Sequence, residues 1–326
     1  MPRLSAVALC LLLAMLPGRA SAADEQPPAG GSSYAPRAPY IRGEESGEPY
    51  LDLEAYRNAY RLAEAADEPY EVLDPWSWQV LPVGLIYSPY LADTKSSRFA
   101  ATFVNVEEDG WLFDATLGTQ VGLLRYGSTS AFFPEGLQVD AEGSAQARLD
   151  MPGDLDVRSV DFRGGLPISF GVGPRRWKFG YYHISSHLGD EFLLKNPTYP
   201  RLNFVRDVLI FGYSRHHTPN LRSYVEIGWA FRSDISEPWE VQFGIDYAPA
   251  GPTGIHGAPF FALNGHLREE VDWGGMFTFQ AGWAWRSDVN TSLLRAGMQY
   301  YNGKSSQYSF YNEHEHQIGL ALWYDY

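Results

Sequence analysis

His183 and Ser185 have the types and spacing best suited to chemistry, because a histidine base beside a serine hydroxyl is a combination used in nucleophilic ester hydrolysis. They lie in a stretch, residues 177–187, that predicts a β-strand. Side chains of a strand alternate between two faces, so these two residues share one face. That face consists of Trp177, Phe179, Tyr181, His183, Ser185 and His187. A His–Ser pair on a surface apolar enough to meet lipid suggests hydrolysis of lipid esters.

An acidic partner for this pair is Asp207, in the next predicted strand. Residues 188–202 contain glycine, proline and acidic residues, and they predict a long loop before the chain returns near Asn203. Antiparallel pairing that sets residue 187 opposite residue 203 also sets His183 opposite Asp207, with Cβ atoms about 5 Å apart. Ser185 would then be the nucleophile, His183 the base and Asp207 the acid that orients the histidine. A slip of one residue would move Asp207 to the other face, so the prediction depends on register.

The stretch Gly180 to Ser185, in sequence Gly-Tyr-Tyr-His-Ile-Ser, resembles the strand motif of the outer-membrane phospholipase A family. Its His-x-Ser core also resembles the outer-membrane lipid A deacylases. Both resemblances imply a barrel whose histidine and serine face lipid near the outer leaflet. Those families complete the triad with an asparagine or glutamate farther along the chain, and Asn196 is nearest to that spacing here. Because Asn196 lies in the loop, Asp207 is preferred as the acid; Ser186 replaces the asparagine that usually follows the serine.

The phospholipase resemblance also implies dimerisation and a calcium ion held by loop oxygens, for which Asp190 and Glu191 are the matching residues. A second interpretation is a metal site, because His183 and His187 share a strand face close to the same two carboxylates. A third is an ordinary rim and loop without chemistry. The ligand-rich run 313–316 predicts a solvated loop that leads into the last strand.

The N-terminus predicts export from the cell. Arg3 precedes an apolar run, residues 7–16, that is too short to span a bilayer as a helix. Ala20-Ser21-Ala22 follows, which predicts a signal peptide of residues 1–22. Cys10 is the only cysteine and lies within it, so the mature chain is neither a disulfide scaffold nor a cysteine enzyme or thiolate metal site.

Composition favours a membrane barrel over other exported proteins. The net charge of −14 argues against nucleic acid and against polybasic docking on anionic lipid. No later segment is apolar enough for a transmembrane helix, whereas 15% aromatic residues and 32 glycines suit many strands and turns. Residues 318–326 alternate and end on Tyr326, which resembles the closing strand of outer-membrane barrels. That resemblance implies location in the cell outer membrane, contact with membrane lipid and recognition by the barrel-assembly machinery.

The chain divides into four predicted parts. Residues 1–22 form the signal peptide, 23–49 a disordered leader rich in Pro, Gly and Ser, and 50–75 a short helical segment. Residues 76–326 form an all-β, antiparallel transmembrane β-barrel of about twelve strands. The strands are predicted to begin near Arg98, Leu112, Gly136, Val157, Trp177, Asn203, Arg222, Val241, Pro259, Trp273, Ser292 and Glu315. Residues 76–87 predict either a further strand or a segment leading into the barrel.

Residues 78–91 and 183–191 resemble an exported bacterial family known as domain of unknown function 1207, and that resemblance implies no activity. Two functions stay open. The first is a lipid-ester hydrolase of the outer leaflet, and the second is a non-catalytic structural barrel or small pore, which inward charges such as Lys178, Arg206 and Arg268 would suit. A soluble sandwich is a third reading, since alternation alone does not say which face meets water.

Overall fold

The computed structural model describes residues 40–42, 49–51 and 76–326. The predicted signal peptide and most of the predicted leader and helical segment lie outside the described residues, so the structure does not test these predictions. Two short strands, β1 (Tyr40–Arg42) and β2 (Pro49–Leu51), pair in antiparallel fashion. None of the helices among the described residues is both long and apolar enough to span a membrane.

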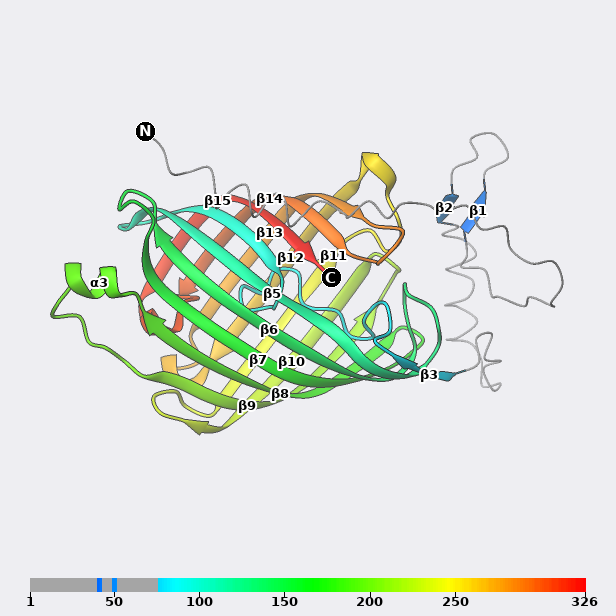
Figure 1. Ribbon diagram of the computed structural model, residues 1–326, viewed down its shortest axis with the longest axis horizontal. Coiled ribbons are helices and arrows are strands. Elements are labelled where there is room, and N and C mark those ends of the chain that lie inside the picture. Colours follow the sequence, from blue (N-terminus) through cyan, green and yellow to red (C-terminus); the bar gives the residue numbers. More distant parts are fainter. Residues whose placement is uncertain (1–39, 43–48, 52–75) are drawn as a thin grey trace. The chain divides into compact units, whose positions relative to one another are not determined.

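Within residues 76–326, twelve antiparallel strands close into a barrel, because β4 pairs with β15 and each strand pairs with the next along the chain (Figure 1). Every strand begins within two residues of its predicted start, so the predicted transmembrane barrel is confirmed. The strands are β4 (Phe99–Val106), β5 (Gly110–Gly127), β6 (Gly136–Asp150), β7 (Asp156–Val172), β8 (Arg175–Leu188), β9 (Phe204–His216), β10 (Leu221–Ser233), β11 (Trp239–Tyr247), β12 (Ala258–Arg268), β13 (Gly275–Arg286), β14 (Leu293–Lys304) and β15 (His314–Asp325).

The two faces of the barrel wall differ in the way expected for a membrane barrel. Exposed large apolar side chains lie along the outer face, for example Phe211, Phe243 and Leu320. Charged residues are buried inside, among them six fully buried arginines: Arg125, Arg148, Arg176, Arg206, Arg268 and Arg295. In a soluble sandwich the apolar faces would point inward, so this arrangement excludes the soluble β-sandwich considered as the third interpretation.

A segment without regular structure, residues 81–98, passes through the lumen; we call it the inner segment. It follows a short strand, β3 (Ser77–Val80), which pairs with the C-terminal end of β5. The Tyr90 hydroxyl donates a hydrogen bond to the Glu226 carboxylate of β10 over 2.9 Å, and the Lys95 ammonium pairs with Asp161 of β7. These contacts join the inner segment to separate strands of the wall, so it fills part of the lumen.

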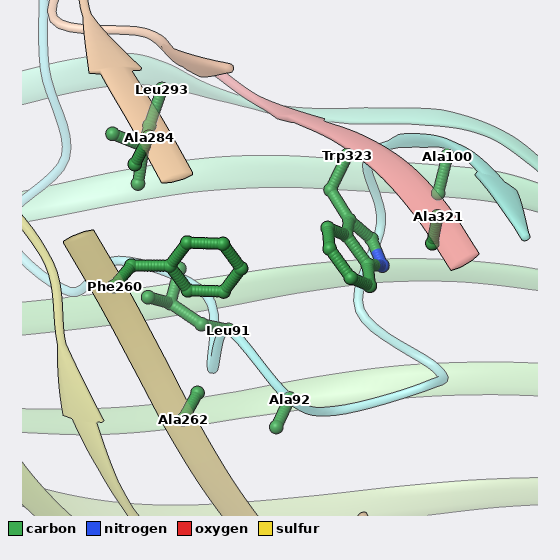
Figure 2. Packing of buried hydrophobic residues seen from close by; sticks show 9 residues of the cluster. All are labelled: Leu91, Ala92, Ala100, Phe260, Ala262, Ala284, Leu293, Ala321 and Trp323. Atoms are coloured by element: carbon green, nitrogen blue, oxygen red, sulfur yellow. The ribbon is translucent and has the colours of Figure 1, made fainter. Parts of the chain in front are cut away.

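An apolar cluster fixes the inner segment at one end of the barrel. Leu91 and Ala92 pack with Phe260 of β12 and Trp323 of β15, whose rings lie next to each other (Figure 2). The Phe260 and Trp323 rings stand at 82° to one another with centroids 5.8 Å apart. Edge-to-face packing of this kind adds to the stabilisation that burial of the rings supplies.

The opposite end of the barrel carries the longest connection, residues 189–203, with the short helix α3 (Asp190–Lys195); we call it the α3 end. The β14–β15 connection at the same end contains the 3-10 helix η3 (Tyr308–Phe310), which enters the lumen. There the Tyr308 ring stacks on Phe204 with centroids 4.6 Å apart. Two more 3-10 helices lie in connections, η1 (Gly254–His256) and η2 (Glu269–Val271).

Candidate active site on the outer face

The pairing of β8 with β9 sets His183 directly opposite Asp207, and Ser185 opposite Val205. This is the register predicted from the sequence, and it is confirmed. The three residues, Ser185, His183 and Asp207, therefore lie on the outer face of the barrel near the α3 end, and we call them the outer row. Their neighbours in the chain point inward, because the side chains of a strand alternate between faces.

The histidine and the acid are in direct contact. The His183 Nδ1 atom lies 2.8 Å from Oδ1 of Asp207, a normal hydrogen-bond distance. Because a carboxylate only accepts hydrogen bonds, Nδ1 carries the proton, and in this tautomer the Nε2 lone pair is the one that could act as a base. The His183 side chain is 42% exposed and that of Asp207 11% exposed. Asp207 is thus largely covered, whereas the His183 ring is accessible from outside the barrel.

Tyr181 supports the same acid, a role that sequence reasoning did not assign. Its hydroxyl donates a hydrogen bond to Oδ1 of Asp207 over 2.6 Å. Two donors on one carboxylate oxygen restrict the orientation of Asp207, and this in turn orients the His183 ring. The alternation of β8 already placed Tyr181 on the His183 face, but only the pairing with β9 brings its hydroxyl to Asp207.

Ser185 stands apart from the contact pair. Among the described residues, its hydroxyl makes no hydrogen bond with His183. Residues two apart on one strand face are separated by about 6.7 Å along the strand. The structure therefore joins His183 to Asp207 and places Ser185 on the same face, without a hydrogen bond between Ser185 and His183. Catalytic contacts of this kind are often loose until substrate binds.

The inward side chains of β8 are firmly anchored. The Tyr182 hydroxyl donates to Oε1 of Glu240 over 2.5 Å, and the Ser186 and Ser309 hydroxyls lie 2.7 Å apart. Ile184 is fully buried in a cluster with Phe204 and Tyr308. Each anchor alternates with a residue of the outer row, so the interior holds that part of the wall in place.

An open space adjoins the outer row on its other side. Gly164 of β7 lies directly opposite His183, and a Cβ atom added there would meet nothing within 4 Å. The outward neighbours of Gly164 along β7 are Phe162 and Leu166, which are 47% and 55% exposed. The result is a notch in the outer surface, floored by glycine and flanked by apolar side chains. This open space could not be predicted from the sequence, because the glycine pair Gly164-Gly165 is also typical of an ordinary bend.

The residues proposed for calcium are not assembled into a metal site. Asp190 and Glu191 form the first turn of α3 and are exposed. The described part of the chain contains no group of three or more His, Cys, Asp or Glu side chains placed to hold a metal ion. Two carboxylates supply at most four of the six to eight oxygens that calcium takes, so backbone carbonyls or waters would have to supply the rest.

The alternative metal interpretations meet the same objection. His183 and His187 with the nearby carboxylates do not form a group placed to hold a metal ion among the described residues.

The run 313–316 was expected to be solvated, but this is wrong for Glu315, which is buried. Its carboxylate lies 2.6 Å from a guanidinium nitrogen of Arg148. Glu315 is the second residue of β15 and faces the lumen, where it neutralises a buried arginine.

Comparison with known proteins places the chain in a family and among barrels of similar fold. A family model described as "Protein of unknown function (DUF1207)" matches residues 74–326. No curated protein matches the sequence significantly. Among solved structures, outer membrane phospholipase A from Escherichia coli has 10% identity and a TM-score of 0.47, over 81% of this chain and 96% of that one.

Two further solved structures are similar in the same range. The outer membrane phospholipase dimer of Salmonella typhi with bound calcium has 13% identity and a TM-score of 0.47, over 73% of this chain and 93% of that one. The KdgM porin in complex with disordered oligogalacturonate has 10% identity and a TM-score of 0.39, over 70% of this chain and 99% of that one.

Proposed function

This chain belongs to the DUF1207 family, and we propose that it is a serine-dependent hydrolase of lipid esters in the outer membrane. The observation that carries the proposal is the His183–Asp207 hydrogen bond on the same outer face as Ser185. A base that is oriented by an acid and shares a surface with a hydroxyl is the arrangement that activates a serine nucleophile.

The proposed reaction has two steps. Ser185 Oγ attacks the acyl carbonyl carbon while His183 Nε2 takes the hydroxyl proton. The tetrahedral species collapses as the ester C–O bond breaks, and His183 returns the proton to the departing alcohol oxygen. A water molecule then attacks the acyl-serine, with His183 again taking and returning one proton. The products are a fatty acid and the lipid lacking one acyl chain, and Asp207 stabilises the imidazolium that forms in each step.

The position of the outer row supports a lipid substrate. The row lies on the apolar outer face, and the open space above Gly164 is flanked by the apolar side chains of Phe162 and Leu166, which suits contact with an acyl chain. The α3 end carries the longest connection, as the outward-facing ends of outer-membrane barrels commonly do. With that end outside, Ser185 lies at the level of the outer leaflet, near the ester groups of its lipids.

The second candidate, a pore, is less well supported. A conducting barrel needs a continuous aqueous lumen. Here the inner segment pairs Lys95 with Asp161 and packs Leu91 against Phe260, while η3 enters from the other end. A structural barrel without chemistry remains the direct rival, because it requires nothing of the outer row.

The test of the proposal uses refolded full-length protein in detergent micelles and in planar bilayers. Fatty acid release is measured from phosphatidylglycerol and from lipid A, and single-channel current is recorded in parallel. We expect ester cleavage and no steady conductance. Conductance without cleavage would establish the pore, and the absence of both for folded protein would establish the structural barrel.

A further inference from the structure

Arg232 of β10 is brought to the outer row by a β-bulge. The pairing of β10 with β9 runs regularly up to Ala230 opposite Val208, and then shifts so that Arg232 lies opposite Asp207. Phe231 is the extra residue between them. Regular alternation from the buried Ala230 would turn Arg232 inward, whereas the bulge sets it beside Asp207 on the outer face. Bulges of this kind commonly redirect a side chain next to a functional site.

The environment of Arg232 differs from that of the arginines in the lumen. Arg148 and Arg206 are buried and lie within 4 Å of carboxylates. Arg232 is exposed, and within the described part of the chain its guanidinium makes no hydrogen bond or ion pair. Trp229 and Phe231, both exposed, are its outward neighbours on β10. Asp207 lies opposite Arg232 and attracts it, but that carboxylate is already bonded to Tyr181 and His183 and forms no ion pair with Arg232. A guanidinium in an apolar, aromatic wall is costly to retain, so a further anion at the membrane surface would stabilise it.

Phosphate is the anion that suits this position. Guanidinium groups bind phosphate through two parallel hydrogen bonds, and the phosphates of a membrane lie at the level of its aromatic belt. Arg232 is two strands from Ser185, about 10 Å across the sheet, and one step of about 7 Å along it. An arginine side chain on one side and a lipid backbone on the other together bridge that separation.

We infer that Arg232 binds the phosphate of the lipid whose ester is presented to Ser185, so that the site selects phosphate-bearing lipids over neutral glycerides. This inference rests on the proposed hydrolase function. It assigns Arg232 to substrate binding, with Ser185 and His183 left to the chemistry. The phosphate belongs either to a glycerophospholipid or to lipid A, which share the feature of a phosphate close to acyl esters.

The test compares Arg232→Gln with Arg201→Gln, which removes the same charge from the exposed loop at the same end of the barrel. Hydrolysis is measured on phosphatidylglycerol, on lipid A and on diacylglycerol in mixed micelles. We expect Arg232→Gln to lower cleavage of the phosphate lipid that the wild type uses by about 10-fold, as for one charged hydrogen-bonded contact. Diacylglycerol cleavage stays at the wild-type rate, Arg232→Lys recovers part of the loss, and Arg201→Gln cleaves all three lipids as the wild type does.

Two results would overturn the inference. Equal losses on all three lipids would mean that Arg232 acts through Asp207 rather than on phosphate. Unchanged rates on all three would mean that it is only an anchor at the membrane surface.

A binding measurement separates this inference from the hydrolase proposal. In a Ser185→Ala background, which cannot turn over, native mass spectrometry counts phosphatidylglycerol bound to the barrel with and without Arg232→Gln. Fewer bound lipids in the double variant support the phosphate site even if the wild type proves inactive. Equal binding by both variants contradicts it, whatever the activity.

Discussion

Ser185 and Ser186 are neighbours in the chain, yet the pleat of β8 sends them to regions with opposite character. Ser186 is buried in the lumen and bonded to Ser309 of η3. Ser185 lies on the outer face without a hydrogen bond to His183 within the described residues. The next strand repeats the contrast, because Arg206 points into the ionic network of the lumen while Asp207 holds His183 outside.

The contrast separates stabilising polar residues from candidates for function. Inside the barrel, charges are paired with charges, and their burial explains why they are there. On the lipid face, polar side chains destabilise a barrel, by about 2–4 kcal/mol for a basic residue at mid-membrane and less near the interfaces. Four polar or charged residues close together on that face (Ser185, His183, Asp207 and Arg232) therefore need a reason other than stability.

Apart from loss of the proposed nucleophile itself, the largest effect is expected at the acid. Asp207→Asn keeps the shape but removes the negative charge that fixes the His183 tautomer and stabilises the imidazolium. We expect kcat to fall on the order of 10⁴-fold, by analogy with the same change in serine proteases. The free energy of unfolding in urea should change by only about 1 kcal/mol, since the asparagine oxygen can still accept the hydrogen bonds that Tyr181 and His183 donate. A folded variant with full activity would remove Asp207 from the site.

The matching change inside should do the reverse. Glu240 accepts a hydrogen bond from Tyr182 and lies 3.4 Å from Arg206 and 3.2 Å from His266. Glu240→Gln leaves a buried guanidinium short of its counter-charge, so we expect the free energy of unfolding to fall by about 3 kcal/mol. Urea unfolding followed by tryptophan fluorescence measures this. Activity per folded molecule should stay near that of the wild type. A loss of activity as large as that of Asp207→Asn would contradict the assignment of stability to the lumen and of function to the outer face.

A smaller effect is expected at the notch. Gly164→Phe fills the open space beside His183 with a ring, without touching the lumen. If an acyl chain occupies the notch, kcat/KM for long-chain esters should fall by about 10-fold, and less for short-chain esters. Kinetics on an ester series of increasing chain length measure the difference. Equal losses at every length would mean that the ring disturbs His183 rather than excludes a chain.

The smallest effect is expected from calcium removal. Because no third acidic or histidine side chain joins Asp190 and Glu191 among the described residues, we expect chelator to leave the rate of ester cleavage unchanged. The same holds for Asp190→Ala with Glu191→Ala. A rate that falls with chelator and returns with added calcium would show that this site is completed in some other way, for instance in the dimer that the phospholipase resemblance implies.

Much of the wall could be predicted from the sequence, because each strand alternates and is bounded by turn residues. The register of β8 and β9 followed from the point where the chain returns after the loop, and it brought Asp207 to His183. The inner segment could not be predicted, since its contacts, such as Lys95 with Asp161, join residues far apart in the chain. The bulge at Phe231 was missed for the same reason, and with it the position of Arg232.

The most direct test of the central claim compares two variants of adjacent serines. Ser185→Ala and Ser186→Ala each remove one hydroxyl from β8, one on each face. Fatty acid release from refolded protein should fall by at least about 10⁴-fold in Ser185→Ala, because the nucleophile is lost. It should stay near the wild-type rate in Ser186→Ala. Equal activity of the two variants, or loss in Ser186→Ala alone, would contradict catalysis on the outer face.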